Sequence, residues 1–437
     1  MSNASDNRSA RFFLMLTLVF AGEIVFGLPF HTARFFRPTF LEAFNFSNTQ
    51  LGDVFAVYGI MAMIAYFPGG ILADRFSARS LLTVSLVATG LGGLYMATYP
   101  GVLGMSLLYG YWGVTTILLF WGALIRATRE WGGDNAQGVA FGVLEGGRGL
   151  VAAALSTMGV VALAVIMPDA VEAATNAERR EAFRAVILLY AIAALLAGAM
   201  TWFVIPPSRH GGDSSRGVLA VVGIVASRPL VWAQALIIIC AYCGYKGLDN
   251  YSLYAVQVLG MDEVDGAKLS MFGGYIRPFA PVILGLLADR WAAARSTGLC
   301  FGVLVISFAL LSMALPEGVG LVIIYGNLVI SIFTLFALRG IYFALLEENR
   351  VPPFLTGAVA GMVSFIGFTP DFFFGPITGR ILDASPGLAG HQNYFLFLTG
   401  ASIVGLLAVM WLLRLQRATT AATWPTAASL RLPPETS

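Results

Sequence analysis

Ionisable residues stand inside long apolar segments at several places in this 437-residue chain. Glu23 lies in an apolar run, Arg148 follows Glu145 by three residues, and Arg277 precedes a charged turn by twelve residues. Such residues are costly in an apolar helix unless they face a cavity or a partner, so each is a candidate functional residue. A guanidinium has a planar donor fork that suits carboxylate binding, which predicts an anion site at Arg148 and Arg277.

A second set of charged residues lies nearer the opposite ends of two apolar segments. A shift of 215 residues along the chain aligns His31 with Lys246 and Arg34 with Asp249. We expect His31, Arg34 and Lys246 to contribute to the substrate site. His31 could also take up a proton, because histidine titrates near neutral pH. The alternative is that His31 and Arg34 lie at a hydrated outer rim.

Three carboxyl groups are candidates for proton coupling: Glu23, Asp371 and Glu145. Glu23 lies about 18 Å into its segment at the rise of an α-helix, where a carboxyl group could carry a proton. Asp371 follows a proline, and the irregular backbone that proline causes is tolerated in a membrane only along cavities or within protein. The alternative is that these carboxylates are structural partners of Arg148, Arg277 or Arg339.

Three tyrosines in segments expected to border the cavity, Tyr66, Tyr245 and Tyr275, are further candidate ligands, although aromatic residues at helical spacing more often serve packing. The sequence contains no phosphate-binding loop, metal-ligand cluster or nucleophile–base pair. We therefore expect no enzymatic activity, no cofactor and no metal. The basic residues are scattered among loops, which argues against nucleic acid as a partner.

Membrane helices must position these residues, because 58% of the chain is apolar and only 11% is charged. A bilayer span needs about 20 apolar residues. The sequence predicts an all-α integral membrane protein with twelve spans, at residues 11–37, 48–74, 79–98, 101–125, 137–166, 182–205, 228–258, 265–289, 296–315, 318–346, 354–382 and 392–415.

The polar stretch 206–227 separates six predicted spans from the next six. We therefore predict an N-terminal six-helix bundle (1–205), a cytoplasmic linker (206–227), a C-terminal six-helix bundle (228–417) and a disordered cytoplasmic tail (418–437). Arginines are concentrated at one set of loops, while most loop acids, Glu317 among them, lie in the opposite set. By the positive-inside rule we expect both termini to be cytoplasmic.

One charged turn occurs twice. The sequence GGILADRFSARS (69–80) returns as ILGLLADRWAAARS (283–296), each copy between two apolar segments. Repeated turns between repeated spans indicate two homologous bundles, an architecture that transporters use for alternating access. The turn resembles the signature loop of the major facilitator superfamily. The resemblance covers the whole chain and implies two pseudo-symmetric six-helix bundles that function as a monomer. It also implies a location in the inner (plasma) membrane of a bacterium.

This resemblance implies roles for particular residues. Asp74, Arg75, Asp289 and Arg290 would act as gating residues at the turns, and the alternative is that they only fix topology by charge. Spans five and eight of the superfamily face each other, so Arg148 and Arg277 would meet near the bilayer midplane. An arginine in span eight is typical of nitrate/nitrite, oxalate/formate and monocarboxylate members. Span two has no arginine between Tyr58 and Pro68, which argues against nitrate itself.

The sequence therefore predicts a secondary transporter that moves a small organic anion, a carboxylate or an acidic sugar, in symport with protons. Span five lacks the Gly-Pro pair that many drug antiporters of the superfamily carry, which favours symport or uniport. The alternatives are an exporter of a metabolite, siderophore or drug, and a non-transporting assembly or sensor protein on the same fold.

Overall fold

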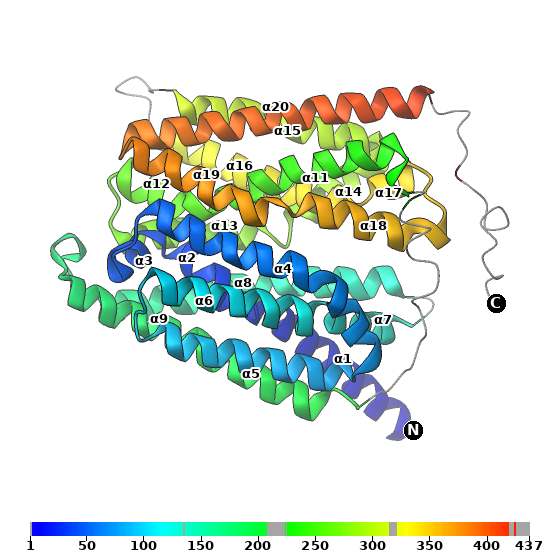
Figure 1. Cartoon of the computed structure of the whole chain (residues 1–437), viewed down its shortest axis with the longest axis horizontal. Coiled ribbons are helices and arrows are strands. Elements are labelled where there is room, and N and C mark those ends of the chain that lie inside the picture. Colours follow the sequence, from blue (N-terminus) through cyan, green and yellow to red (C-terminus); the bar gives the residue numbers. More distant parts are fainter. Residues whose placement is uncertain are drawn as a thin grey trace. The chain divides into compact units, whose positions relative to one another are not determined.

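All regular elements of the described chain are helices, as Figure 1 shows for this computed structural model. The structure describes residues 2–133, 136–207, 223, 225–313, 321–418 and 424. Ten helical stretches within these ranges are long and apolar enough to cross a membrane. This confirms the predicted all-α membrane architecture. The other two predicted spans, 79–98 and 354–382, coincide with one helix and with a pair of shorter helices, respectively.

The helices of the first half of the sequence follow one another closely. They are α1 (Ser2–Ile24), the π-helical turn η1 (Gly27–His31), α2 (Thr32–Phe35), α3 (Arg37–Phe44), α4 (Asn48–Arg75), α5 (Ala78–Met96), α6 (Val102–Gly113), the π-helical segment η2 (Val114–Trp121), α7 (Gly122–Gly132), α8 (Gln137–Ile166), the 3-10 turn η3 (Val171–Ala173) and α9 (Asn176–Val204).

The second half of the sequence is interrupted more often. Its elements are α11 (Pro229–Gly247), the 3-10 turn η4 (Leu248–Asn250), α12 (Tyr251–Gln257), α13 (Glu263–Ile276), α14 (Ala280–Trp291), α15 (Ala293–Ser312), α16 (Leu321–Ile341), α17 (Leu345–Glu348), α18 (Pro353–Gly367), α19 (Pro370–Ala384) and α20 (Leu388–Ala418).

Several predicted spans are broken where their ionisable residues lie. The first span passes from α1 into η1 just after Glu23, and the eighth is broken between α13 and α14 at Arg277. In the eleventh span, α18 ends before Pro370, which begins α19 and precedes Asp371. Proline has no N–H to continue a helix, which explains the last break. These charged residues therefore lie at or near helix ends and not in the middle of continuous helices.

The chain forms two compact units that do not coincide with the two sequence halves. Unit 1 contains Met1–Gly212, Lys246–Phe279 and Asp371–Tyr394, and unit 2 contains Asp213–Tyr245, Ala280–Pro370 and Phe395–Ser437. Parts of the seventh, eighth and eleventh predicted spans thus pack with the first half of the sequence. The division into bundles at 206–227 stays a prediction. Most of that linker, most of the predicted tail and Glu317 lie outside the described residues.

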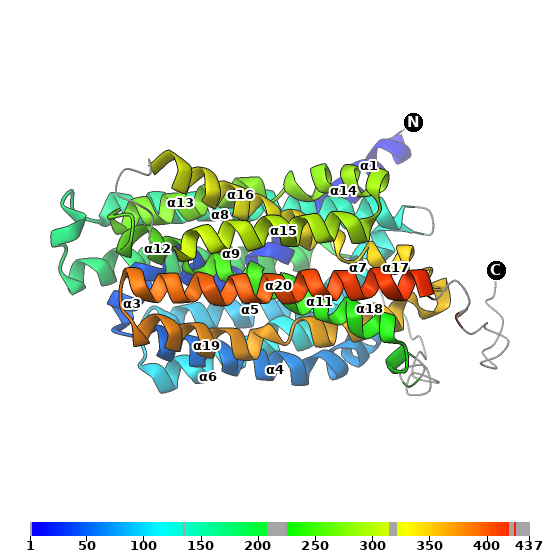
Figure 2. The ribbon, with the colours of Figure 1, turned by 90° about the horizontal axis from the view of Figure 1, so that it is seen from above.

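Within unit 1, α4 and α19 lie side by side at backbone contact distance (Figure 2). A Cβ atom on Gly52 would lie 2.2 Å from the carbonyl oxygen of Gly375, and one on Gly379 would lie 2.4 Å from that of Asn48. Small residues allow this approach, as is usual where membrane helices cross closely. The carboxylate of Asp383 then accepts hydrogen bonds from the backbone N–H groups of Asn48 (3.1 Å) and Thr49 (2.7 Å) at the start of α4.

We expect Gly52→Ala to destabilise the protein by about 1–3 kcal/mol, the usual cost of overpacking, because α4 and α19 would have to move apart. The measurement is thermal unfolding of the purified protein in detergent. Gly142→Ala is the matched control, because a Cβ atom on that helical glycine meets nothing within 4 Å. Equal melting temperatures for the two variants would contradict the close contact.

Candidate functional site

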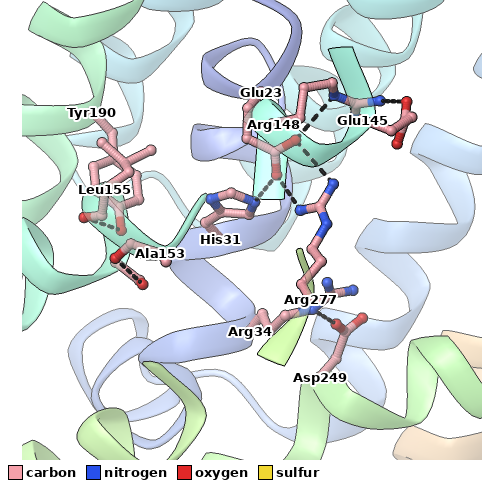
Figure 3. Close-up of polar contacts among 11 residues, drawn as sticks. Glu23, His31, Arg34, Glu145, Arg148, Ala153, Leu155, Tyr190, Asp249 and Arg277 are labelled. Atoms are coloured by element: carbon pink, nitrogen blue, oxygen red, sulfur yellow. Dashed lines mark hydrogen bonds and ion pairs between the residues drawn. The ribbon is translucent and has the colours of Figure 1, made fainter. Parts of the chain in front are cut away.

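The carboxylate of Glu23 lies at the centre of a group of basic side chains in unit 1 (Figure 3). One oxygen, Oε1, lies 2.5 Å from Arg277 Nη1 and 3.2 Å from His31 Nε2. The other, Oε2, accepts hydrogen bonds from Arg277 Nη2 and Arg148 Nε, both at 3.1 Å. Only 2% of the Glu23 side chain is exposed. We call Glu23, His31, Arg148 and Arg277 the Glu23 cluster.

Four different elements deliver these side chains. Glu23 is near the end of α1, His31 ends η1, Arg148 lies on α8, and Arg277 follows the last residue of α13. Small residues allow the elements to approach each other. A Cβ atom on Gly22 would lie 3.3 Å from Arg148 Cδ, and one on Gly149 would lie 3.1 Å from Pro278 Cγ. The cluster therefore depends on these glycines as well as on its charged members.

Arg148 forms ion pairs with one buried carboxylate and one exposed carboxylate. Its Nε binds Glu23, while its Nη1 lies 2.5 Å from Oε1 of Glu145, whose side chain is 53% exposed. The two arginines and two glutamates balance in formal charge. This arrangement matches the expected meeting of Arg148 and Arg277, and it also provides the structural pairing considered as the alternative. Their role as substrate ligands stays a prediction.

A second buried ionic group in unit 1 joins the residues that the 215-residue shift aligns. Arg34 Nε lies 2.5 Å from Asp249 Oδ1, and Lys246 Nζ lies 3.4 Å from Asp249 Oδ2 and 3.6 Å from Asp371 Oδ1. Lys246 also lies over the ring of Phe30, at 4.7 Å from its centroid. Asp371 thus pairs with Lys246, whereas Arg148 is bound by Glu23 and Glu145.

The hydrated-rim alternative for His31 and Arg34 is wrong, because both side chains are buried. The π-helical turn η1 places His31 beside Glu23, and η4 presents Asp249 to Arg34. Burial of a guanidinium is tolerable only with a close partner of opposite charge, which Asp249 supplies.

The three candidate tyrosines occupy different surroundings. The hydroxyl of Tyr275 is hydrogen-bonded to Thr157 Oγ1 at 2.7 Å, and Tyr66 is half-buried on α4. In unit 2, the guanidinium of Arg339 lies 4.1 Å from the ring centroid of Tyr245. The structure therefore brings Tyr275 into contact with α8, the helix that carries Arg148 of the Glu23 cluster. Tyr245 instead contacts Arg339 within unit 2.

The repeated turns end α4 and α14. Asp74 and Arg75 are exposed in the last turn of α4, where Arg126 Nη1 donates to the carbonyl of Ala73 at 2.5 Å. A cation at a helix C-terminus is favourable, so Arg126 caps this end. Arg290 is exposed at the end of α14, and the side chain of Asp289 lies outside the described ones. A gating role for these four residues stays a prediction.

Sequence reasoning missed two buried polar groups of unit 1. Arg37 is 3% exposed and donates to Asn48 Oδ1 from Nε and Nη2, each at 3.2 Å. Glu263 accepts a hydrogen bond from Thr39 at 2.8 Å and pairs with Arg179 at 2.5 Å. These residues begin or end helices, where charged side chains are ordinary, so the sequence offered no signal of their burial.

Within the described ranges no His, Cys, Asp and Glu side chains gather as a metal site.

Comparisons with known proteins agree with this architecture. Residues 12–370 match the model of the Major Facilitator Superfamily. The chain is 27% identical to the inner membrane protein YqcE of Escherichia coli (strain K12), over 97% of this chain and 99% of that protein. It is 25% identical to the probable nitrate/nitrite antiporter NarK1 of Thermus thermophilus, over 89% of this chain and 87% of that protein.

A solved structure shares the fold. It is the crystal structure of a bacterial homolog of the human lysosomal transporter Spinster in an inward-facing, unoccupied conformation. The TM-score is 0.71 at 13% sequence identity, and the match covers 96% of this chain and 99% of that one. At this identity the similarity supports the fold alone.

We expect Glu23→Ala to destabilise the protein by about 3–5 kcal/mol, because it leaves two buried guanidiniums without their shared acceptor. Arg277→Ala should cost much less in a Glu23→Ala background than alone, which a double-mutant cycle of unfolding free energies would measure. Glu172→Ala, at an exposed glutamate, is the control. Additive effects of Glu23→Ala and Arg277→Ala would contradict the described pairing.

Proposed function

The chain belongs to the Major Facilitator Superfamily of transporters, not enzymes, and we propose that it moves a small organic anion across the inner membrane in symport with a proton. One observation carries this proposal. Inside unit 1 a carboxylate, that of Glu23, is held by Arg148 from the first half of the sequence and Arg277 from the second. The protein thus contains an internal carboxylate bound as a substrate carboxylate would be.

Protonation of Glu23 is the proposed coupling step. A neutral carboxyl group is a weaker acceptor for two guanidiniums than a carboxylate, because charge-assisted bonds are stronger. The carboxylate of a substrate could then take the place of Glu23 on the two arginine forks. One proton added and one monoanion bound leave the formal charge of the cluster unchanged, so burial of the substrate adds no uncompensated charge.

The surroundings of Glu23 suit such a proton transfer. His31 Nε2 lies 3.2 Å from Glu23 Oε1, within reach of a single proton step, and imidazole both accepts and donates protons near neutral pH. The second group, Arg34, Lys246 and Asp371, is the other candidate for binding and proton coupling. Lys246 is held loosely at 3.4 and 3.6 Å from its two carboxylates, which would let it exchange partners.

Movement of the sequence halves would act on the same bonds. Because Arg148 and Arg277 come from different halves, rocking of one bundle against the other would strain or break their bridge through Glu23. A bound anion would restore that bridge when Glu23 is protonated. We propose that Asp74 and Arg75 in unit 1, and Asp289 and Arg290 in unit 2, each have a gating role at their turn on the cytoplasmic side, together with both termini. We further propose that Tyr66 and Tyr275 of unit 1 contact the substrate, while Tyr245 stays a separate candidate ligand within unit 2. The likeness to a probable nitrate/nitrite antiporter favours an anionic cargo.

We expect Arg148→Lys and Arg277→Lys each to lower uptake by about 10–100-fold, since loss of a bond to a charged group costs about 1.5–3 kcal/mol and lysine lacks the fork. The measurement is uptake of labelled carboxylates and acidic sugars into proteoliposomes. Arg184→Lys is the control, because that arginine binds only the carbonyl of Ala97 among the hydrogen bonds of the described chain. Full uptake by both cluster variants would refute the proposal.

We expect Glu23→Gln to abolish accumulation driven by an inward proton gradient while downhill exchange of the anion persists. Glutamine keeps the shape of glutamate and an acceptor oxygen but cannot take up the coupling proton. Uptake would be compared with and without an imposed pH gradient. Gradient-driven accumulation by Glu23→Gln at the wild-type level would exclude Glu23 as the proton carrier, and Asp371→Asn would then be tested in the same way.

A further inference from the structure

Two aromatic rings flank the guanidinium of Arg148. Its Cζ atom lies 5.7 Å from the ring centroid of Phe26 and 5.7 Å from that of Trp121. The two rings meet edge to face, with centroids 6.2 Å apart. Phe26 lies between α1 and η1, and Trp121 is the last residue of η2. Two π-helical irregularities therefore meet at one arginine, and such irregularities are frequent at functional sites.

The two rings are more accessible than the buried Glu23 and Arg148 side chains. Phe26 and Trp121 are half-buried, and Glu145, the second partner of Arg148, is exposed. The rings therefore present part of their surface to whatever occupies the space beside Arg148. An aromatic pair next to a cation provides a flat, apolar surface on which a planar group stacks favourably.

Two N–H groups beside these rings have no hydrogen-bond acceptor among the described residues. Arg148 donates from Nε to Glu23 and from Nη1 to Glu145, and its Nη2 has no acceptor among the described residues. The indole N–H of Trp121 likewise has no acceptor within the described part of the chain. A planar acid whose carboxylate takes the place of Glu23 on the arginines could rest its carbon skeleton on the rings, with these donors available for a further hydrogen bond.

Two tyrosine hydroxyl groups, on helices that contact η2 or α8, are already hydrogen-bonded within the protein. Tyr58 is hydrogen-bonded to Thr116 at 2.8 Å, and Tyr275 to Thr157 at 2.7 Å. A polyhydroxylated acid needs many such partners, because each buried hydroxyl group left unpaired loses binding energy. The chemistry beside Arg148 thus favours few hydrogen bonds and a flat apolar contact.

We infer that Phe26, Trp121 and Arg148 form an aromatic subsite that selects carboxylates with a planar carbon skeleton, aromatic or unsaturated, over acidic sugars. This inference rests on the proposed anion transport and deepens it by naming the substrate class. Phe26 and Trp121 act as specificity residues: they hold the skeleton of the substrate, while the arginines hold its carboxylate.

The test is binding of four acids to the purified full-length protein, measured by equilibrium dialysis: benzoate, cyclohexanecarboxylate, glucuronate and acetate. Benzoate and cyclohexanecarboxylate have the same number of carbon atoms, but only benzoate has a planar ring. We expect the wild type to prefer benzoate by about tenfold over the other ring compounds, as stacking on an aromatic pair implies. Trp121→Leu should lose this preference and still bind acetate. Trp202→Leu is the matched control, because Arg79 lies over that ring at 4.0 Å.

The outcomes separate the two proposals. If Trp121→Leu keeps the tenfold preference, or if the wild type prefers glucuronate, the aromatic subsite is wrong while anion transport stands. If no acid binds the wild type, or if binding is unchanged in Arg277→Lys, the anion site itself is wrong. Loss of the preference in Trp202→Leu would trace it to general destabilisation and would also overturn the aromatic subsite.

Discussion

The shared carboxylate of Glu23 is the constraint on which the rest of unit 1 depends. Two buried guanidiniums cannot stand close together in an apolar surrounding without a common counter-charge. Glu23 supplies it, and the helices that carry Arg148 and Arg277 must therefore converge on α1. Glycines at the contacts and a helix break at Arg277 make this convergence possible. The fold is thus organised around a charge that the addition of one proton would neutralise.

Further contacts within unit 1 link the two halves of the sequence, as the bonds of Glu23 to Arg148 and Arg277 do. The Arg34–Asp249 pair, the Thr39–Glu263 bond and the contact of α4 with α19 each join the first half to a part of the second within unit 1. A substrate that replaces Glu23 on the arginines would act at the centre of this set of contacts. Occupancy and conformation are then linked by the same bonds, which is the requirement for coupled transport.

The sequence predicted the membrane helices and the candidate residues better than it predicted which side chains those residues contact. Depth along a helix was enough to single out Glu23, Arg148 and Arg277, since charges in apolar runs are conspicuous. Their mutual contacts were harder, because Glu23 is separated from Arg148 by 125 residues and from Arg277 by 254. The alternative that His31 and Arg34 lie at a hydrated rim is wrong because both side chains are buried, and the π-helical turn η1 beside them is not revealed by hydrophobic periodicity. Arg37 and Glu263 escaped notice because charges near helix ends carry no signal of burial.

The most direct test of the account is a count of protons taken up on binding. The carboxylate that binds the wild type most tightly would be titrated calorimetrically, at one pH, in two buffers with different heats of ionisation. If the substrate displaces Glu23 from the arginines as that group is protonated, the wild type takes up about one proton per anion bound and Glu23→Gln takes up none. Binding without proton uptake by the wild type, or the same uptake by Glu23→Gln, would contradict the exchange of one carboxylate for another.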